Sequence, residues 1–305
     1  MSPRHIIRAQ DFDRTYLEHL FAKSNGFQYG SVAFGDILRD KIIVQLFYEP
    51  STRTRFSFES ATLRLGGSII GTENGAEFSS AVKGESLEDS IRVISEYGDA
   101  IVLRHTESNA AERAARVASV PIINAGCGIG QHPTQALLDL YTIQEKIGRI
   151  DGIHIALCGD LKHGRTIRSL AYLLGKYQDV QITFVSPSEL KVEPDILEYL
   201  DRHGIRHDEV DTLEKVIRHV DALYVTRIQK ERIKGTIDAE TLMRPHRVNI
   251  AVASQMKSSA IIMHPLPRND EIDPAVDTLP QAAYFDQARN GLFVRMALLG
   301  SILAS

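Results

Sequence analysis

Short runs of β-branched and other apolar residues alternate along the chain with longer segments in which apolar residues recur at helical spacing. Several of the short runs are continuously apolar, which is typical of strands in parallel sheets covered by helices on both faces. The pattern predicts strands at residues 41–48, 100–104, 120–124, 153–158, 180–185, 221–226 and 260–263. It predicts helices at about 55–65, 86–97, 133–147, 165–176, 193–203 and 212–220, and a last helix from about 291 to the end.

This alternation over 305 residues predicts an α/β fold with mainly parallel sheets. The length allows two domains, and the series of strands and helices restarts after Gly148. We therefore expect two lobes, each a mainly parallel sheet flanked by helices, joined by interdomain helices such as the one at 133–147. The expected division is 1–132 plus 286–305 for one lobe and 133–285 for the other. The small, polar, Gly-rich segment 71–84 is expected to be a loop.

Composition narrows the class of protein. Net charge is −4 with no long basic block, which argues against nucleic acid as a partner. No apolar run approaches the roughly 18 residues that a membrane span needs, and the N-terminal residues lack the apolar core of a signal peptide. The two cysteines, Cys127 and Cys158, have no His/Cys cluster near them, so we expect buried free thiols and neither a disulfide nor a metal site. A cytoplasmic location is the expectation.

The strongest local feature is the segment E-P-S-T-R-T-R at residues 49–55, directly after a predicted buried strand. Pro50 ends the strand, and Ser51 or Thr52 can cap the helix that follows. Hydroxyls and the guanidinium of Arg53 then meet the positive end of a helix, which favours an anion such as phosphate. The alternative on spacing alone is an ordinary capped helix with solvated arginines.

The same segment, followed by F-S-F-E, resembles the carbamoyl-phosphate loop of the aspartate and ornithine carbamoyltransferase superfamily. Four further motifs resemble that superfamily in the same order: H-P-T-Q at 132–135, G-D-L-K-H-G-R-T at 159–166, R-I-Q-K-E-R at 227–232 and H-P-L-P-R at 264–268. The resemblance spans nearly the whole chain. It implies that 1–132 plus 286–305 bind carbamoyl phosphate and that 133–285 bind the amino acid. The reaction needs no metal, cofactor or covalent nucleophile.

The second half of the chain indicates which acceptor is used. Ornithine enzymes of the superfamily carry H-C-L-P and S-M-G segments, whereas Pro265 stands here at the cysteine position and R-x-Q-x-E-R replaces S-M-G. Arg165, Arg227 and Gln229 suit the two carboxylates of aspartate, and such cations would repel the side chain of ornithine. The resemblance thus implies carbamoyl transfer to L-aspartate, an early step of pyrimidine biosynthesis.

The motifs leave one alternative function open and argue against two others. Another amino acid or amine could be the acceptor. A binding-only homologue would have no physical reason to keep all the reactive residues. Residues 159–166 nearly fit a nucleotide P-loop, but Arg165 replaces the lysine and a nucleotide role would leave the 49–55 and 132–135 segments unexplained.

The resemblance also implies a role for each candidate site residue. The catalytic set is Arg53, Thr54, Lys83, Arg104 and His132. The carbamoyl-phosphate set is Ser51, Thr52, Arg53, Thr54, Ser79, Arg104, His132 and Gln135, with the carbonyls of Pro265 and Leu266. The aspartate set is Lys83, Arg165, Arg227 and Gln229.

Within these sets, Arg104 would bridge the phosphate and the carbonyl oxygen, and His132 would polarise the carbonyl together with Thr54 and Arg104. A structural His132 that caps the 133–147 helix is a competing interpretation, and both roles can hold at once. Ser79 and Lys83 would reach the active site of a neighbouring subunit. The resemblance therefore implies a homotrimer with shared active sites, small anionic substrates, and in some members a separate regulatory chain.

Overall fold

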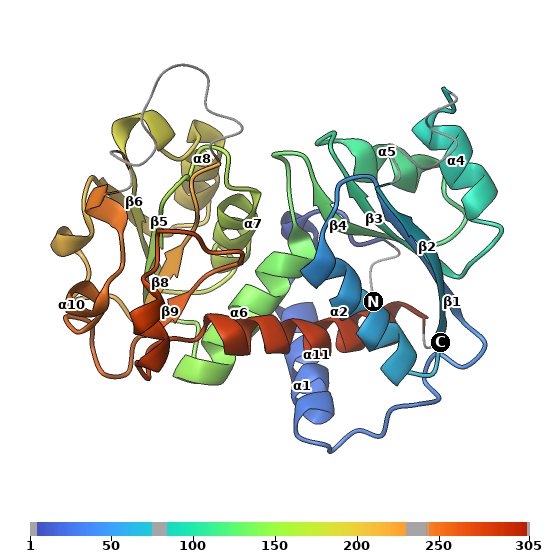
Figure 1. Ribbon diagram of the computed structural model, residues 1–305, viewed down its shortest axis with the longest axis horizontal. Helices are drawn as coiled ribbons and strands as arrows, with labels where there is room; N and C mark the ends of the chain where they lie inside the picture. Colours follow the sequence, from blue (N-terminus) through green and yellow to red (C-terminus); the bar gives the residue numbers. More distant parts are fainter. Residues whose placement is uncertain (1–4, 75–83, 230–241, 243, 304–305) are drawn as a thin grey trace. The chain divides into compact units, whose positions relative to one another are not determined.

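A computed structural model of the chain describes residues 5–74, 84–229, 242 and 244–303 (Figure 1). The chain divides into two compact units. Unit 1 comprises Met1–Leu137 and Arg289–Ser305, and unit 2 comprises Leu138–Ala288. Each unit is built on its own parallel sheet, as the strand–helix alternation predicts.

Unit 1 holds a four-stranded sheet in the order β2-β1-β3-β4. All neighbouring strands are parallel, so their carboxyl ends lie at one edge. The strands are β1 (Ile42–Phe47), β2 (Ser68–Glu73), β3 (Ala100–His105) and β4 (Ile122–Cys127). Among the described residues, the helices that lie wholly within unit 1 are α1 (Arg14–Gln28), α2 (Thr52–Arg64), α4 (Leu87–Ile94) and α5 (Ala110–Val117).

Helices α4 and α5 cover one face of this sheet (Figure 1). Because side chains alternate along a strand, that face receives Val44, Leu46, Ile101 and Leu103, which pack with the apolar side chains of both helices. Arg104 follows Leu103 on β3 but does not join this cluster, and its side chain bonds to Glu49 and to the carbonyl of Ala125 instead. The apolar cluster under α4 and α5 is thus separate from Arg104, one of the candidate site residues.

Unit 2 holds a five-stranded parallel sheet in the order β7-β6-β5-β8-β9. Its strands are β5 (His154–Cys158), β6 (Gln181–Val185), β7 (Arg206–Val210), β8 (Ala222–Val225) and β9 (Ile261–Met263). The helices that the structure describes wholly within this unit are α7 (Arg165–Leu174), α8 (Pro194–Arg202) and α10 (Ile250–Ala253). The strand order reverses between β5 and β8, and ligands of open α/β sheets bind outside the carboxyl ends of the strands at such a switch point.

Two helices run from one unit into the other. Helix α6 (Pro133–Ile147) begins in unit 1 and ends in unit 2, and α11 (Tyr284–Leu303) begins in unit 2 and ends in unit 1. The expected helix at 133–147 is confirmed. The last helix starts seven residues before the predicted Gly291, since a glycine inside a helix costs only about 1 kcal/mol and packing outweighs it. The described residues also form short 3₁₀ turns: η1 (Ala9–Asp11), η3 (Ser188–Leu190), η4 (Leu213–Lys215), η6 (Arg244–His246) and η7 (Pro274–Thr278).

The predicted helix at 212–220 is wrong. That segment makes only the 3₁₀ turn η4, although Leu213, Val216, Ile217 and Val220 are buried in the core of unit 2. These residues have the i, i+3, i+4 and i+7 spacing of a helix. In the folded unit their side chains reach the core from an irregular turn instead.

Strands β2 and β7 were not predicted, and the expected loop at 71–84 is wrong in its first residues, since β2 continues to Glu73. Both are edge strands whose residues are mostly exposed or half-buried, so neither has the apolar run of a central strand. Helices α1 and α5 were also missed. Cys127 and Cys158 are buried free thiols, as predicted. Of the helices that the structure describes, none is both long enough and apolar enough to span a bilayer.

Candidate active site

In unit 1, the predicted phosphate loop lies between β1 and α2. Ser51 occupies the position before the first helical residue, but its side chain makes no capping hydrogen bond, contrary to the expectation that Ser51 or Thr52 would cap the helix. The caps of α1 and α4, Asp13 and Ser86, do make that bond. The first-turn N–H groups of α2 therefore have no serine cap, which is the arrangement found where a helix start binds an anion.

Arg53 and Thr54 follow in the first turn of α2. Thr54 is buried, whereas Arg53 is exposed at the surface of the chain. Although the residue is exposed as a whole, neighbouring protein atoms desolvate its guanidinium in part, which lowers the pKa of Arg53 from its ordinary value. No carboxylate pairs with Arg53 within the described part of the chain, so its charge is left to attract an anion.

Arg104 lies at the carboxyl end of β3 and is buried. Its Nη1 donates to the carbonyl of Ala125 on β4 at 3.1 Å, and its Nη2 donates to Oε1 of Glu49 at 3.1 Å. Glu49 opens the 49–55 segment, and Arg104 is in register with Phe47 on the neighbouring strand. The ion pair thus fixes the guanidinium of Arg104 beside the phosphate loop.

His132 follows β4 and immediately precedes α6. Its carbonyl accepts from the N–H groups of Gln135 at 3.0 Å and Ala136 at 3.2 Å, so its backbone starts the helix as the structural interpretation expects. The buried ring lies with Nδ1 3.4 Å from the hydroxyl of Thr134. The carboxyl ends of β1, β3 and β4, three adjacent strands, thereby present Ser51–Thr54, Arg104 and His132 on one edge of the sheet. Gln135 is buried one turn into α6.

In unit 2, the candidate residues also follow the carboxyl ends of three adjacent strands. Arg165 begins α7 after β5, Arg227 and Gln229 follow β8, and Pro265 and Leu266 follow β9. The loops after β5 and β8 touch closely at Gly159. A Cβ there, at φ +117°, would lie 2.2 Å from the carbonyl oxygen of Thr226, so only glycine fits.

Asp160 joins the loops after β5 and β8. Its side chain is fully buried, with Oδ1 accepting from the backbone N–H of His163 at 3.0 Å and Oδ2 from that of Gln229 at 3.1 Å. The amide of Gln229 donates back to the carbonyl of His163 at 2.7 Å. Asp160 therefore sets the relative position of Arg165 and the 227–229 segment, a role that sequence reasoning missed although the residue lies in a quoted motif.

Some predicted residues fall outside the described part of the chain. They are Ser79 and Lys83, together with residues 230–232 of the R-x-Q-x-E-R segment. Across the described residues, no group of three or more His, Cys, Asp or Glu side chains is placed to hold a metal ion.

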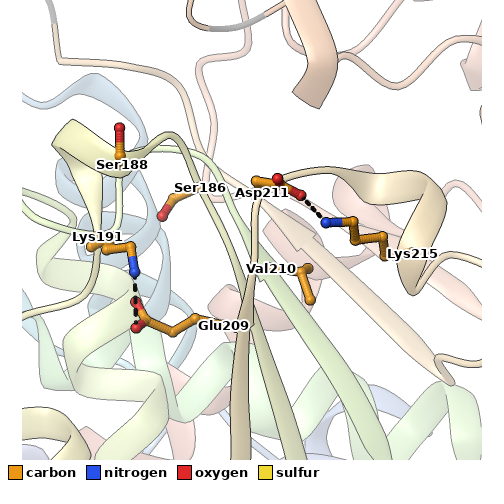
Figure 2. A pocket seen from close by; sticks show the side chains of 7 residues that line it. All are labelled: Ser186, Ser188, Lys191, Glu209, Val210, Asp211 and Lys215. Carbon is orange, nitrogen blue, oxygen red and sulfur yellow. Dashed lines mark hydrogen bonds and ion pairs between the residues drawn. The ribbon is translucent and has the colours of Figure 1, made fainter.

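A cavity of about 220 Å³ opens at the carboxyl ends of β6 and β7 in unit 2 (Figure 2). Figure 2 shows its two lysines turned toward carboxylates: Lys191 pairs with Glu209 at 3.3 Å, and Lys215 pairs with Asp211 at 2.6 Å. These charges cancel, so the cavity offers no surplus positive charge for a dianion. No predicted site residue lines it.

Comparison with known families agrees with this geometry. The model described as the aspartate/ornithine carbamoyltransferase carbamoyl-P binding domain matches residues 4–145, and the model described as the Asp/Orn binding domain matches residues 151–302. The chain belongs to the aspartate/ornithine carbamoyltransferase family. Family membership accounts for the two units, each with its own sheet, and for the order of the five motifs.

Individual carbamoyltransferases are similar over almost the whole chain. Aspartate carbamoyltransferase 1, chloroplastic, of Pisum sativum is 52% identical over 98% of this chain and 78% of its own length. The aspartate carbamoyltransferase catalytic subunit of Thermoplasma acidophilum is 50% identical over 98% of both chains. The crystal structure of Trypanosoma cruzi aspartate transcarbamoylase in complex with carbamoyl phosphate and aspartate is 39% identical, covers 99% of this chain and 96% of its own, and has a TM-score of 0.92.

Proposed function

We propose that the chain is an aspartate carbamoyltransferase, which transfers the carbamoyl group of carbamoyl phosphate to L-aspartate in pyrimidine biosynthesis. The products are N-carbamoyl-L-aspartate and phosphate. The observation that carries the proposal is the identity of about half of the residues to aspartate carbamoyltransferases along nearly the full chain. The candidate cations of both units, at the carboxyl ends of parallel strands, support it.

Unit 1 is proposed to bind carbamoyl phosphate. The uncapped start of α2, with Ser51, Thr52 and Thr54, binds the phosphate oxygens, and Arg53 supplies a charge that no described carboxylate neutralises. Arg104 is aimed by Glu49 and stabilises both the leaving phosphate and the oxyanion of the tetrahedral intermediate. His132 donates to the same oxyanion, while Gln135 binds the carbamoyl amide.

Unit 2 is proposed to bind L-aspartate. Arg165 and Arg227 pair with its two carboxylates, and Gln229 adds a polar contact from a loop that Asp160 holds in place. The carbonyls of Pro265 and Leu266 accept hydrogen bonds from the carbamoyl amide and orient it. The neutral amine of aspartate then attacks the carbonyl carbon, the C–N bond forms, the C–O bond to phosphate breaks, and the proton that the amine loses leaves with the phosphate.

Assembly is proposed to be a homotrimer in which Ser79 and Lys83 serve the active site of a neighbouring subunit. Exposed apolar side chains on α2 and on the edge strand β2, Phe56, Leu63 and Ile70, support self-association of unit 1. The Thermoplasma acidophilum relative is called a catalytic subunit, which makes a separate regulatory chain a partner to test for. Two buried free thiols are compatible with a reducing cytoplasm.

A product assay tests the proposed reaction. Purified protein is given carbamoyl phosphate with L-aspartate, and separately with L-ornithine, and the ureido products are identified by mass. We expect N-carbamoyl-L-aspartate and phosphate in equal amounts and no citrulline. Citrulline, or no product under conditions in which the protein binds phosphate, would contradict the proposal and direct the search to another amine.

A further inference from the structure

The turn that follows β9 contains an unusual backbone conformation. Leu266 has φ +55°, in the left-handed region that a branched non-glycine residue seldom adopts. Such a conformation persists only where the surroundings hold it. The contacts around residues 264–268 must therefore hold this turn, which carries the two carbonyls proposed to orient the carbamoyl amide.

The buried ring of His264 contacts the backbone of this turn. Its side chain is 1% exposed, and its Nδ1 lies 2.8 Å from the backbone nitrogen of Leu266. A backbone N–H only donates, so Nδ1 must accept and carries no proton. The neutral ring then has its proton on Nε2, which lies 2.8 Å from Oε1 of Glu271 and donates to it. Geometry at both nitrogens thus selects one tautomer.

Glu271 completes the arrangement. It is also buried, and its Oε1 accepts from the backbone N–H of Asn269 at 3.0 Å as well as from His264. Burial by itself raises the pKa of Glu271, but the hydrogen bonds from His264 and Asn269 outweigh burial and leave this pKa below its ordinary value. The carboxylate therefore stays ionised and accepts from both donors.

A second set of hydrogen bonds fixes the backbone of His264. Its N–H donates to Oε1 of Gln287 on α11 at 2.8 Å. The amide of Gln287 donates to Asp139 on α6 at 2.6 Å, and Asp139 accepts from the hydroxyl of Tyr224 on β8 at 2.8 Å. All of these groups are buried in unit 2. His264 is thus fixed at its backbone and at both ring nitrogens.

We infer that His264 and Glu271 are positioning residues that hold the Leu266 backbone in its left-handed conformation and so aim the carbonyls of Pro265 and Leu266 at the carbamoyl amide. This inference rests on the proposed function. Neither side chain touches the substrate. A proton on Nδ1 would face the Leu266 N–H, donor against donor, so the turn needs the neutral ring. The titratable groups around this ring in the described contacts are Glu271 and, through Gln287, Asp139.

Two substitutions of His264 test the contacts of its two ring nitrogens separately. In H264Q the amide nitrogen can still donate to Glu271, but nothing accepts from Leu266. In H264N the amide oxygen can still accept from Leu266. H154Q is the matched control, because His154 is a half-buried histidine at the first residue of β5 that contacts Thr183 at 2.9 Å and has no part in the site.

Two ligands distinguish a loss of carbonyl positioning from a general loss of stability. Phosphonoacetamide carries the amide of carbamoyl phosphate, whereas inorganic phosphate does not. By calorimetry we expect H264Q to bind phosphonoacetamide about tenfold more weakly, H264N about threefold or less, and both to bind phosphate as the wild type does. Equal losses for both ligands, or no loss for phosphonoacetamide in H264Q, would overturn the inference.

The wild-type protein supplies an independent readout if a variant does not fold. Nitrogen-15 spectra of labelled histidine report the tautomer, and we expect His264 to carry its proton on Nε2 throughout the pH range of activity. A proton on Nδ1 in the active protein would also overturn the inference. Failure of the wild type to make N-carbamoyl-L-aspartate would instead contradict the proposed function, so the two outcomes are distinguishable.

Discussion

At the scale of single residues, three carboxylates, two of them buried, orient residues proposed to bind substrate. Glu49 aims Arg104, Asp160 joins the loops of Arg165 and Gln229, and Glu271 acts through His264. Each is a carboxylate that accepts from fixed N–H donors. Charge-assisted hydrogen bonds of this kind are stronger than neutral ones, so we expect the loss of one to disturb the orientation of the residue it holds.

Asp160→Asn tests this idea. The asparagine amide must present a donor where Asp160 now accepts from His163 or Gln229, so one contact becomes donor against donor. We expect kcat/KM for aspartate to fall about 30-fold, equivalent to about 2 kcal/mol, with the KM for carbamoyl phosphate changed much less. Steady-state kinetics measures both.

Asp151→Asn is the control for that substitution, because Asp151 also accepts from a backbone N–H in unit 2, that of Gln178 at 2.8 Å, but outside the site. An unchanged kcat/KM for aspartate in D160N, or an equal loss in D151N, would argue against an orienting role for Asp160.

At the scale of elements, the sheets place the candidate residues. In each unit, three adjacent parallel strands end at one edge, and a candidate site residue lies in each strand or in the segment that follows it. The opposite edge of the unit 2 sheet is held by Asp221, which accepts from the backbone N–H of His154 on β5 at 3.0 Å and from Lys257 at 2.8 Å. This amino edge contributes stability and contains none of the candidate site residues.

We expect Asp221→Asn to make the free energy of unfolding change less between neutral and acid pH. Burial alone raises the pKa of Asp221, but Lys257 and the His154 N–H outweigh it and lower the pKa in the folded state. A lowered folded pKa gives stability that is fully present above the unfolded value of about 3.9 and is lost as pH falls through the folded value.

We therefore expect D221N to lower the free energy of unfolding at pH 7 by about 1–2 kcal/mol, with the difference from wild type shrinking below about pH 4. Urea unfolding at pH 7 and at pH 3.5 measures both. Asp211→Asn is the control, since Asp211 also pairs with a lysine but its side chain is 70% exposed, and it should have a small effect at either pH. A constant D221N difference across this range would contradict the expectation.

At the scale of the whole molecule, the proposed trimer makes each active site depend on two chains. Lys83 of one subunit would serve the site that holds His132 of its neighbour. Two inactive variants, K83A and H132A, should then restore activity when they are dissociated and mixed, because about a quarter of the sites in random trimers combine an intact Lys83 with an intact His132. Activity and mass are measured on the separated and mixed proteins.

Mixing of H132A with R104A is the control for that experiment. Both residues lie in unit 1 and are proposed for the same subunit's contribution, so no random mixture contains an intact site. Activity regained in this control, or absent from the mixture of K83A and H132A while mass shows trimers, would contradict sharing. A wild-type protein that is monomeric and fully active would contradict the trimer itself.

Local patterns in the sequence determined much of this protein. The continuous apolar runs predicted seven of the nine described strands, since central parallel strands are apolar on both faces. The ordered motifs identified the superfamily and the residues proposed to bind substrate, because short segments at strand ends carry the reactive groups themselves. The polar edge strands β2 and β7 escaped prediction for the same reason, as an edge exposes its side chains.

Only the tertiary structure decided which groups orient those residues. Glu49 and Arg104 are 55 positions apart, Asp160 and Gln229 are 69 apart, and the Gln287–Asp139 contact spans 148 positions. Parallel strands are joined by long crossovers, so neighbours at a sheet edge are distant in sequence and no local spacing predicts their pairing. The tertiary structure also decided the conformation of segment 212–220. Its apolar residues have helical spacing, but they enter the core of unit 2 from a 3₁₀ turn.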